Sequence, residues 1–442
     1  MRTAAISLAV GLVLADSSIA VLALPALYRE LGVDLADLHW VLTTFNVALA
    51  LAAIPAARIV RSLRPGRAFA AGLVLFALAS AACAAAPSFG ALLAFRAVQA
   101  LGGAAAVVAA LELLPPLVRS RTRAVAVWVG AGAVGAAVGP AVGGVLTEVI
   151  SWRAVFAVQV PLALVPLGFV GGLRSTVVPT PRSTRLRIAP NIALALVSAA
   201  LAAPLFLVVL LLVEGWGLSP IAAASVVSVL PLAAVATAPL VRRVRGVRER
   251  AAAGAILVAG GLGGLALLPR AGWVWTLAPQ ALVGAGLALA ITAVTEAALA
   301  GRETPVNAGI TIAVRHAGVV LGLLLLSPVL VADLDRQRGA AERAGTARLL
   351  DAPVSPRTKI RLARAIGDRL DATPGRIPKL QPAFRSVASD AGERPALAKL
   401  EHDLDDVVDR AVTSTFTRPF ALAAALALAA LVPIALPRRG RG

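Results

Sequence analysis

The stretch GAGAVGAAVGPAVGG, residues 130–144, allows two opposite interpretations. Its first three glycines satisfy the spacing G-x-G-x-x-G, which is typical of a turn that binds a dinucleotide phosphate. Gly135, Gly139 and Gly143 also recur at every fourth residue, which places them on one face of a helix. The sequence around the stretch decides between a phosphate-binding turn and a helix–helix contact.

The composition of the chain favours a membrane protein. It has 442 residues, of which 59% are hydrophobic and 15% are charged, and its mean hydropathy is +0.86. A soluble protein carries about 25% charged residues, so lipid must cover much of the apolar surface. The single cysteine, Cys83, excludes an internal disulfide. With only three histidines in addition, we expect no metal site, and we expect no cofactor.

Apolar stretches long enough to span a bilayer recur along the chain. A spanning helix needs about 20 predominantly apolar residues. The twelve stretches that qualify are 4–26, 40–60, 68–87, 90–117, 124–149, 153–173, 190–213, 219–241, 251–269, 274–300, 307–332 and 417–436. The sequence therefore predicts an all-α membrane protein with two six-helix bundles.

The arginines predict the orientation of these spans. If the amino terminus is cytoplasmic, nearly all arginines of the short connections fall on the inner side, and the short outer loops hold only Arg29, Arg153 and Arg270. This is the positive-inside pattern, so the net charge of +19 reflects topology and predicts no nucleic-acid partner. Arginine and alanine usage suggests a GC-rich bacterial genome. We expect a bacterial cytoplasmic membrane protein with both termini cytoplasmic.

Five segments describe the predicted organisation. They are an N-terminal six-helix bundle (1–173), a cytoplasmic linker (174–189), helices seven to eleven of a C-terminal bundle (190–332), an extracytoplasmic helical segment (333–416), and helix twelve with a basic tail (417–442). We call residues 333–416 the appended segment. Stretches 355–370 and 393–412 within it have helical spacing, so we expect helices that extend spans eleven and twelve or lie over the outer face.

The position of residues 130–144 within a span decides between a phosphate-binding turn and a helix–helix contact. The glycines lie inside the apolar stretch 124–149, and no acidic residue follows at the distance that a dinucleotide-binding fold requires. Small residues four positions apart let two membrane helices approach closely, and Pro140 permits a bend. We interpret residues 130–144 as a packing face with a hinge.

Several motifs resemble those of the drug/proton antiporters of the major facilitator superfamily. GAAVGPAVGG (135–144) is similar to the fifth-helix antiporter motif G-x-x-x-G-P-x-x-G-G. RAVQALGGA (96–104), LADSSIAVLALP (14–25), HWVLTTFNVALA (39–50) and VRHAGVVLG (314–322) resemble motifs of the fourth, first, second and eleventh helices. The resemblance covers nearly all twelve spans and implies the major facilitator fold.

The loop between the second and third spans departs from the family. In ARIVRSLRPGR (57–67), Ala57 replaces the usual glycine and Arg61 replaces the aspartate that helps to close the cytoplasmic gate. The residues that we assign to gating and helix packing are Gly135, Gly139, Pro140, Gly143, Gly144, Arg61 and Arg64.

Charged residues within spans are functional candidates because burying a charge in a bilayer is costly. The resemblance implies a central cavity lined by helices one, four, seven and ten, which gives it Asp16, Arg96 and Glu296. We predict that these three residues couple transport to protons, with Asp16 as the carrier; a static Asp16–Arg96 pair is the alternative. The predicted substrate cavity holds Asp16, Gln99, Arg315, His316 and Glu296.

The function that follows is proton-coupled efflux of hydrophobic or amphiphilic small molecules by alternating access. One alternative is a transporter of lipids or lipid-linked substrates that uses the appended segment. Another is a non-transporting membrane protein whose appended segment docks an extracytoplasmic partner. We expect no enzyme, because the sequence has no paired nucleophile and base, no metal set and no nucleotide loop.

Overall fold

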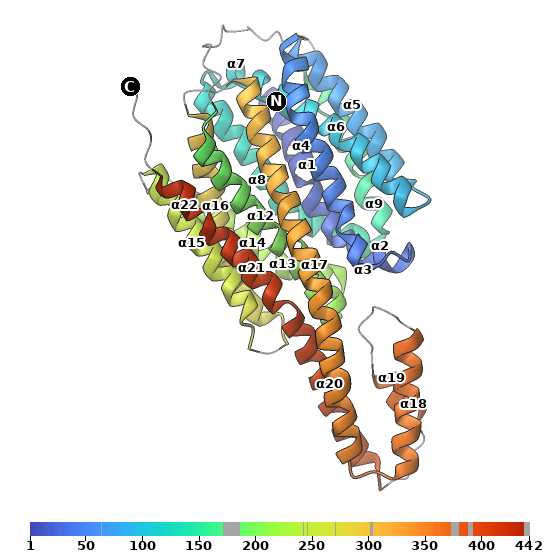
Figure 1. Ribbon diagram of the computed structural model, residues 1–442. Coiled ribbons are helices and arrows are strands. Elements are labelled where there is room, and N and C mark those ends of the chain that lie inside the picture. Colours follow the sequence, from blue (N-terminus) through green and yellow to red (C-terminus); the bar gives the residue numbers. More distant parts are fainter. Residues whose placement is uncertain are drawn as a thin grey trace.

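The apolar stretches form long helices in the computed structural model, which describes residues 1–62, 64–170, 186–241, 243–244, 246–269, 271–300, 304–372, 380–387 and 392–436. These residues contain helices and no strands (Figure 1). The basic tail after residue 436 and most of the predicted linker 174–189 fall outside the described ranges. The all-helical fold class predicted from the sequence is therefore confirmed.

The N-terminal half of the chain contains the first six predicted spans. Its helices are α1 (Arg2–Ala20), η1 (Val21–Ala23), α2 (Leu24–Glu30), α3 (Leu35–Leu38), α4 (Trp40–Ser62), α5 (Pro65–Ala84), α6 (Phe89–Leu113), α7 (Pro115–Val118), α8 (Arg121–Val149), α9 (Trp152–Ala157), α10 (Gln159–Leu164) and α11 (Leu167–Val170). Helix α1 packs against α8, and α4 and α5 pack against α6.

The C-terminal half follows the same plan up to its fifth span. Its helices are α12 (Ile188–Leu210), the π-helical turn η2 (Leu211–Gly215), α13 (Pro220–Val227), α14 (Val229–Val241), α15 (Val247–Ala266), α16 (Val274–Leu299), α17 (Pro305–Asp351), α21 (Thr417–Ala429) and α22 (Leu431–Ala435). Helix α15 packs against α16 and α21, and α12 packs against α17. The halves lie side by side (Figure 1).

Eleven helical segments of the described ranges are long and apolar enough to cross a membrane. The predicted span 251–269 corresponds to α15 and is not among them. Helix α15 has only 20 residues, and Arg248, Glu249 and Arg250 occupy its first turn. These charges shorten its apolar part, which accounts for the difference from the twelve predicted spans.

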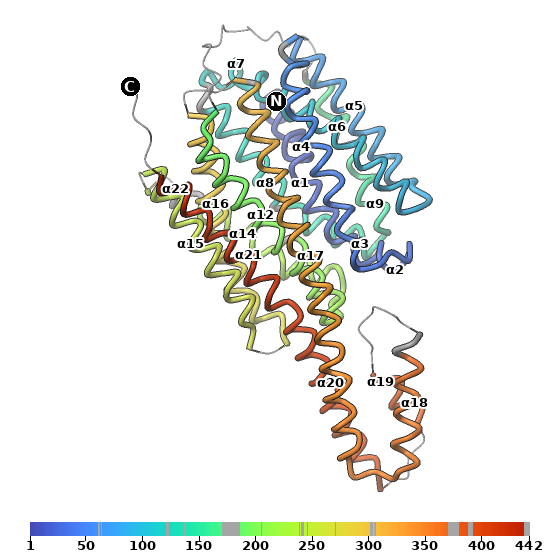
Figure 2. The backbone as a smooth tube through the Cα atoms, viewed as in Figure 1, coloured from blue at the N-terminus to red at the C-terminus, as the bar shows by residue number. Residues whose placement is uncertain are grey.

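The appended segment extends spans eleven and twelve away from the bundle. Helix α17 continues without interruption for 47 residues, well beyond its apolar part. Helices α18 (Pro356–Ala372) and α19 (Gln381–Ser386) follow, and α20 (Arg394–Thr415) returns alongside α17 and leads into α21. Figure 2 shows this projection at the end of the molecule opposite the start of α1. Leu362, Leu400 and Leu404 belong to a buried apolar cluster that is confined to the appended segment.

Apolar packing between the halves differs at the two ends of the bundle. Near the appended segment, Leu22 and Leu42 of the N-terminal half share one buried cluster with Leu210 and Leu326 of the C-terminal half. We call this the sealed end. At the opposite end, the clusters of the two halves are separate, apart from the start of α17, which packs against α4. We call this the split end.

Candidate functional site

A buried ion pair joins α1 and α6 inside the N-terminal half. The Nη1 atom of Arg96 donates a hydrogen bond of 2.5 Å to Oδ2 of Asp16. Both side chains are 0% exposed. An isolated buried charge is costly, and an opposite charge in direct contact offsets much of that cost. The sequence predicted both residues as site residues, and the structure brings them into contact.

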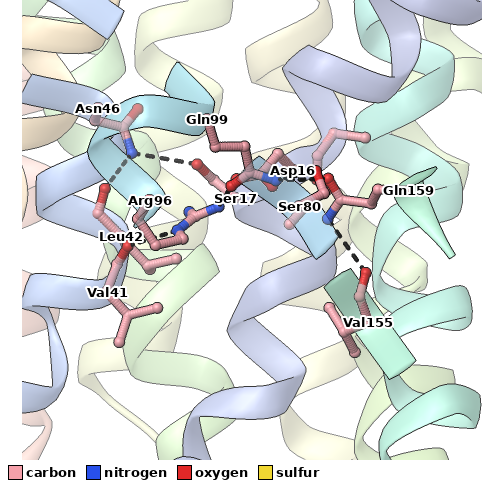
Figure 3. Close-up of polar contacts among 12 residues, drawn as sticks. Asp16, Ser17, Val41, Leu42, Asn46, Ser80, Arg96, Gln99, Val155 and Gln159 are labelled. Carbon is pink, nitrogen blue, oxygen red and sulfur yellow. Dashed lines mark hydrogen bonds and ion pairs between the residues drawn. The ribbon is translucent and has the colours of Figure 1, made fainter. Parts of the chain in front are cut away.

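The pair continues into a network of side-chain amides (Figure 3). Nη1 of Arg96 also donates to Oε1 of Gln99 at 2.7 Å. Nε2 of Gln99 donates to Oγ of Ser80 on α5 at 2.8 Å and to Oε1 of Gln159 on α10 at 3.1 Å. Nε of Arg96 donates to the carbonyl oxygen of Val41 on α4 at 3.2 Å. One connected network thus holds five helices of the N-terminal half together.

Aromatic rings shield the Arg96 guanidinium from solvent. Its central carbon lies 4.4 Å from the ring centre of Phe45 and 5.6 Å from that of Phe156. Both rings are 0% exposed. A cation over an aromatic face is attracted by the ring quadrupole, most strongly when both are desolvated. The guanidinium is therefore held by the aspartate, amide and carbonyl oxygens and by the two rings.

Each member of the pair keeps one unused polar atom. Oδ1 of Asp16 and Nη2 of Arg96 are buried and have no hydrogen-bond partner within the described ranges. A carboxylate oxygen accepts a hydrogen bond or binds a proton, and a guanidinium nitrogen donates. Oδ1 of Asp16 is thus a position where a proton can be added without first displacing a hydrogen bond.

A second polar chain crosses from the N-terminal to the C-terminal half. Nδ2 of Asn46 on α4 donates to Oγ of Ser17, the neighbour of Asp16, at 3.2 Å. Oδ1 of Asn46 lies 2.6 Å from Nδ1 of His316 on α17, and both residues are buried. Closer to the sealed end, Oγ of Ser327 lies 3.2 Å from Nδ1 of His39. Asn46 therefore links the surroundings of Asp16 to the other half.

The other predicted charges lie elsewhere. Glu296 sits near the end of α16, where Oε2 accepts a 2.6 Å hydrogen bond from Nη2 of Arg250. Its side chain is 52% exposed, and the structure does not bring it to Asp16. Arg315 is half-buried beside His316 on α17, and no hydrogen bond or ion pair is recorded for it in the described part of the chain.

The predicted packing face of α8 lies against α1. A Cβ atom added to Gly135 would lie 2.1 Å from the carbonyl oxygen of Gly11, and one added to Gly143 would lie 2.3 Å from that of Ile19. At Gly139 it would meet Oγ of Ser18. Only a residue without a side chain permits such an approach of two backbones.

Two further packing residues and the loop arginines complete the predicted set. Gly144 faces α13 of the C-terminal half, where an added Cβ would lie 2.8 Å from the carbonyl oxygen of Pro220. Pro140 is buried within α8. Arg64 is exposed at the residue before α5. The side chain of Arg61 lies outside the described residues.

Sequence reasoning missed four network residues. Ser80, Gln159, Asn46 and Ser17 are uncharged, so they do not stand out within apolar spans. The available signal was an amide in the stretches HWVLTTFNVALA and VFAVQVPLAL, because burying an amide without a partner is costly. Within the described ranges, no three His, Cys, Asp or Glu side chains are grouped so that they could hold a metal ion.

Comparison with known proteins identifies the family. Residues 6–330 match the Major Facilitator Superfamily. The chain belongs to this superfamily. Membership, together with the eleven candidate spans, makes this major facilitator protein a multi-pass membrane protein of a transporter family, and not an enzyme.

Curated relatives of this major facilitator protein include drug exporters. The chain is similar to the tetracenomycin C resistance and export protein of Streptomyces glaucescens, at 35% identity over 38% of this chain and 31% of that protein. It is also similar to the puromycin resistance protein pur8 of Streptomyces alboniger, at 36% identity over 35% of this chain and 32% of that protein. The matched segments thus span about a third of the length of these relatives.

Solved structures support the fold over nearly the whole chain. A bacterial homologue of the human lysosomal transporter Spinster, in an inward-facing and unoccupied conformation, matches with a TM-score of 0.63 and 17% identity. The match covers 98% of this chain and 97% of that one. A peptide transporter of the POT family, in complex with sulfate, matches with a TM-score of 0.60 over 74% of this chain and 88% of that one, at 14% identity.

Proposed function

We propose that this major facilitator protein exports hydrophobic or amphiphilic small molecules in exchange for protons, and that Asp16 carries the proton. The buried Asp16–Arg96 pair is the observation on which the proposal rests. It is a carboxylate in contact with a guanidinium inside a span, with one oxygen free of hydrogen bonds among the described residues. Relatives named for drug resistance and export support the direction of transport.

The proposed coupling depends on how the pair changes between states. An apolar environment favours the neutral form of a carboxylic acid, and a neighbouring guanidinium favours the charged form. When Asp16 is paired with Arg96, the charged form is stabilised. A rearrangement that separates them favours protonation, and renewed contact releases the proton. Entry of one proton down a potential of 100 mV supplies about 2.3 kcal/mol, which is enough to bias the equilibrium between two conformations.

The two ends of the bundle support alternating access. We propose that the amino terminus and the split end face the cytoplasm and that the sealed end and the appended segment lie outside. In the structure, many buried apolar residues join the halves at the sealed end, whereas at the split end the two clusters are separate apart from the start of α17, which packs against α4. This arrangement corresponds to a state that receives its substrate from the cytoplasmic side of a bacterial plasma membrane.

The proposed packing elements connect the two halves. Gly144 of α8 packs against α13, and at the sealed end the Oε2 atom of Glu148 accepts a 2.7 Å hydrogen bond from the backbone N–H of Ile221. Opening of the sealed end requires that this contact and the His39–Ser327 contact separate. The close packing of α8 on α1 would hold these two helices together as the halves move apart.

Proteoliposomes provide the test of proton-coupled export. Puromycin and tetracenomycin C are the first compounds to examine, because relatives carry their names. We expect an imposed proton gradient to drive uptake of at least one amphiphilic compound and purified protein to release protons when that compound binds. Asp16→Asn removes the titrating group and should abolish both signals while the compound still binds.

The matched control is Glu296→Gln, because the half-exposed Glu296 pairs with Arg250 and has no bond to the Asp16–Arg96 network. This variant should retain proton release and transport. If Asp16→Asn keeps gradient-driven transport at the wild-type rate, Asp16 is not the carrier. If Glu296→Gln abolishes transport as well, the assignment of the coupling to the Asp16–Arg96 pair alone is wrong.

A further inference from the structure

The appended segment contains a cavity between its own helices. The cavity has a volume of about 460 Å³ and lies between α17, α18 and α20. Apolar side chains from all three helices line it, among them Leu349, Ile366, Leu404 and Val408. Ligand sites in proteins typically have volumes of 300–1,000 Å³ and are lined mostly by apolar side chains with few polar groups. We call this space the appended cavity.

The appended cavity is long and narrow. Its lining on α17 runs from Leu334 to Leu350, a distance of about 24 Å along a helix that rises 1.5 Å per residue. A volume of 460 Å³ spread over that length is a trough with a small cross-section. An extended hydrocarbon chain matches this length. Leu350 and Ile360, at 64% and 54% exposure, leave apolar surface uncovered along it.

The charges at the rim of the appended cavity balance one another. Arg338 donates to Glu342 at 2.9 Å, so this pair is already satisfied. The ammonium group of Lys359 donates to the carbonyl oxygen of Leu350, and Asp335 adds one negative charge. Among the described lining residues, two cationic and two anionic side chains therefore stand at the rim, and this balance does not favour a strongly charged ligand. A neutral polar head group suits this rim.

The appended cavity meets a second, smaller space at the sealed end. Leu334, Val412 and Thr415 line both. The second space has a volume of about 40 Å³ and lies between Tyr28 of the N-terminal half and Leu210 of the C-terminal half. The trough therefore leads from the tip of the appended segment to the place where the two halves meet.

We propose that the appended cavity binds a neutral, single-chain amphiphile, with the hydrocarbon chain lying along α17 and the polar head at the charged rim. This site lies outside the Asp16–Arg96 network and outside the predicted spans. If exported molecules also bind here on their way out, that role rests on the proposed function. Binding of the amphiphile itself does not. The proposed binding and the proposed export can therefore be tested separately.

Photolabelling tests the site with the full-length protein in nanodiscs. The probe is hexadecanol that carries a diazirine, and labelled positions are mapped by peptide mass spectrometry. We expect labels on Leu349, Ile366 and Leu404, and we expect excess unlabelled hexadecanol to remove them. Ala341→Trp and Ala363→Trp place an indole into the cavity from α17 and α18, so each should reduce this labelling several-fold.

The matched control is Ala347→Trp. Ala347 is exposed on α17 and does not line the cavity, so its labelling should equal that of the wild type. Circular dichroism and the melting temperature show whether each variant is folded. Because Ala363 is exposed, its tryptophan variant tests the site even if Ala341→Trp disturbs the packing.

Two outcomes overturn the proposal. One is labelling confined to the membrane spans, and the other is labelling of the appended segment that neither cavity variant reduces. Measurement of puromycin transport in the same variants separates the claims. Labelling without transport of any compound supports the binding site and contradicts the proposed export function. Transport without labelling supports export and contradicts the binding site.

Discussion

The two halves of the bundle bury polar groups in different ways. In the N-terminal half, Asp16, Arg96 and Gln99 form bonds that cross between helices. In the C-terminal half, some buried polar side chains bond within their own helix, as Gln280 does with Thr276 at 2.8 Å and Asn191 with the carbonyl oxygen of Arg187 at 2.8 Å. Others, His316 and Ser327 of α17, contact Asn46 and His39 of the N-terminal half. Within the described residues, the ion pair whose two side chains are both 0% exposed thus lies in the N-terminal half.

Close backbone contact, in contrast, is common to both halves. An added Cβ atom would lie 2.1 Å from the carbonyl oxygen of Gly11 at Gly135, and 1.9 Å from that of Leu230 at Gly284. Both halves therefore use small residues to pack their helices, as membrane helices do in the absence of a hydrophobic driving force between them. The halves share a way of packing and differ in electrostatics.

The largest expected effect comes from breaking the buried pair. Arg96→Leu leaves the Asp16 carboxylate buried without its partner, and this should lower the free energy of unfolding by about 3–5 kcal/mol. The double variant Asp16→Leu with Arg96→Leu removes both charges, so it should be more stable than the single variant. Thermal unfolding in detergent measures both.

The control for this effect is the C-terminal pair of Arg250 and Glu296. Its carboxylate is 52% exposed, so Glu296→Gln should cost at most about 1 kcal/mol. Equal losses in Arg96→Leu and Glu296→Gln would contradict the contrast between the halves.

Substitution of the closely packed glycines should lower the free energy of unfolding by less than Arg96→Leu does, and by similar amounts in the two halves. Gly135→Ala and Gly284→Ala each force a methyl group against a backbone carbonyl of a neighbouring helix. Overpacking of this kind costs about 1–3 kcal/mol. Gly130→Ala and Gly260→Ala are the controls, because nothing lies within 4 Å of their added Cβ atoms. Melting temperatures that fall only for Gly135→Ala would show that the packing principle is not shared.

The contact between the halves through Asn46 should be weaker. Asn46→Leu removes the bonds to Ser17 and His316, and interhelical hydrogen bonds of this kind are worth about 0.6 kcal/mol on average and at most about 1.7. A double-mutant cycle with His316→Leu should give a coupling energy of that size. Asn191→Leu, which loses a bond within one helix, should show no coupling to His316→Leu.

The smallest effect is a pH dependence in the appended segment. Hydrogen bonds from the Thr358 hydroxyl at 2.7 Å and the Ser355 backbone N–H at 2.6 Å lower the pKa of the Glu393 carboxyl. A lowered pKa contributes stability that is present above the value in the unfolded chain and is lost as the pH falls through the folded value.

Hydrogen exchange of α18 and α20 measures this contribution. The wild type should be better protected than Glu393→Gln at neutral pH, and the difference should disappear in acid. Burial and neighbouring carboxylates raise the pKa of Asp405 and Asp409 on α20. Their effect on the pH dependence of stability is opposite to that of Glu393, and it is the same in the wild type and in Glu393→Gln. A difference that grows as the pH falls would reverse the sign and contradict the assignment.

The sequence was sufficient for most of the fold, and physical reasons explain where it was not. Long apolar stretches define spans because a helix that crosses the bilayer core needs about 20 predominantly apolar residues. The helix at the predicted span 251–269 runs from Val247 to Ala266, so it begins earlier than predicted, with a charged first turn, and ends earlier as well. Helix α17 also continues beyond its apolar part, because alanine, arginine and leucine, which are abundant in its second half, have high helix propensity.

The candidate site was partly predictable for a similar reason. Asp16 and Arg96 are conspicuous because charges within spans are rare, and the structure brings them together. Glu296 has the same character in the sequence, but it lies near the end of α16, where it is 52% exposed and pairs with Arg250. Sequence distance gives no information on which charges meet across helices. Ser80, Gln159 and Asn46 acquire meaning only from their three-dimensional neighbours.

The uninterrupted course of α17 has a mechanical consequence. A helix of 47 residues is about 70 Å long, and about half of it lies within the bundle. As long as α17 does not bend at Pro328, a small tilt at Gly309 or His316 becomes a displacement of several ångströms at Asp351. The position of the far tip, at a distance from the lipid, should therefore report the tilt of the C-terminal half.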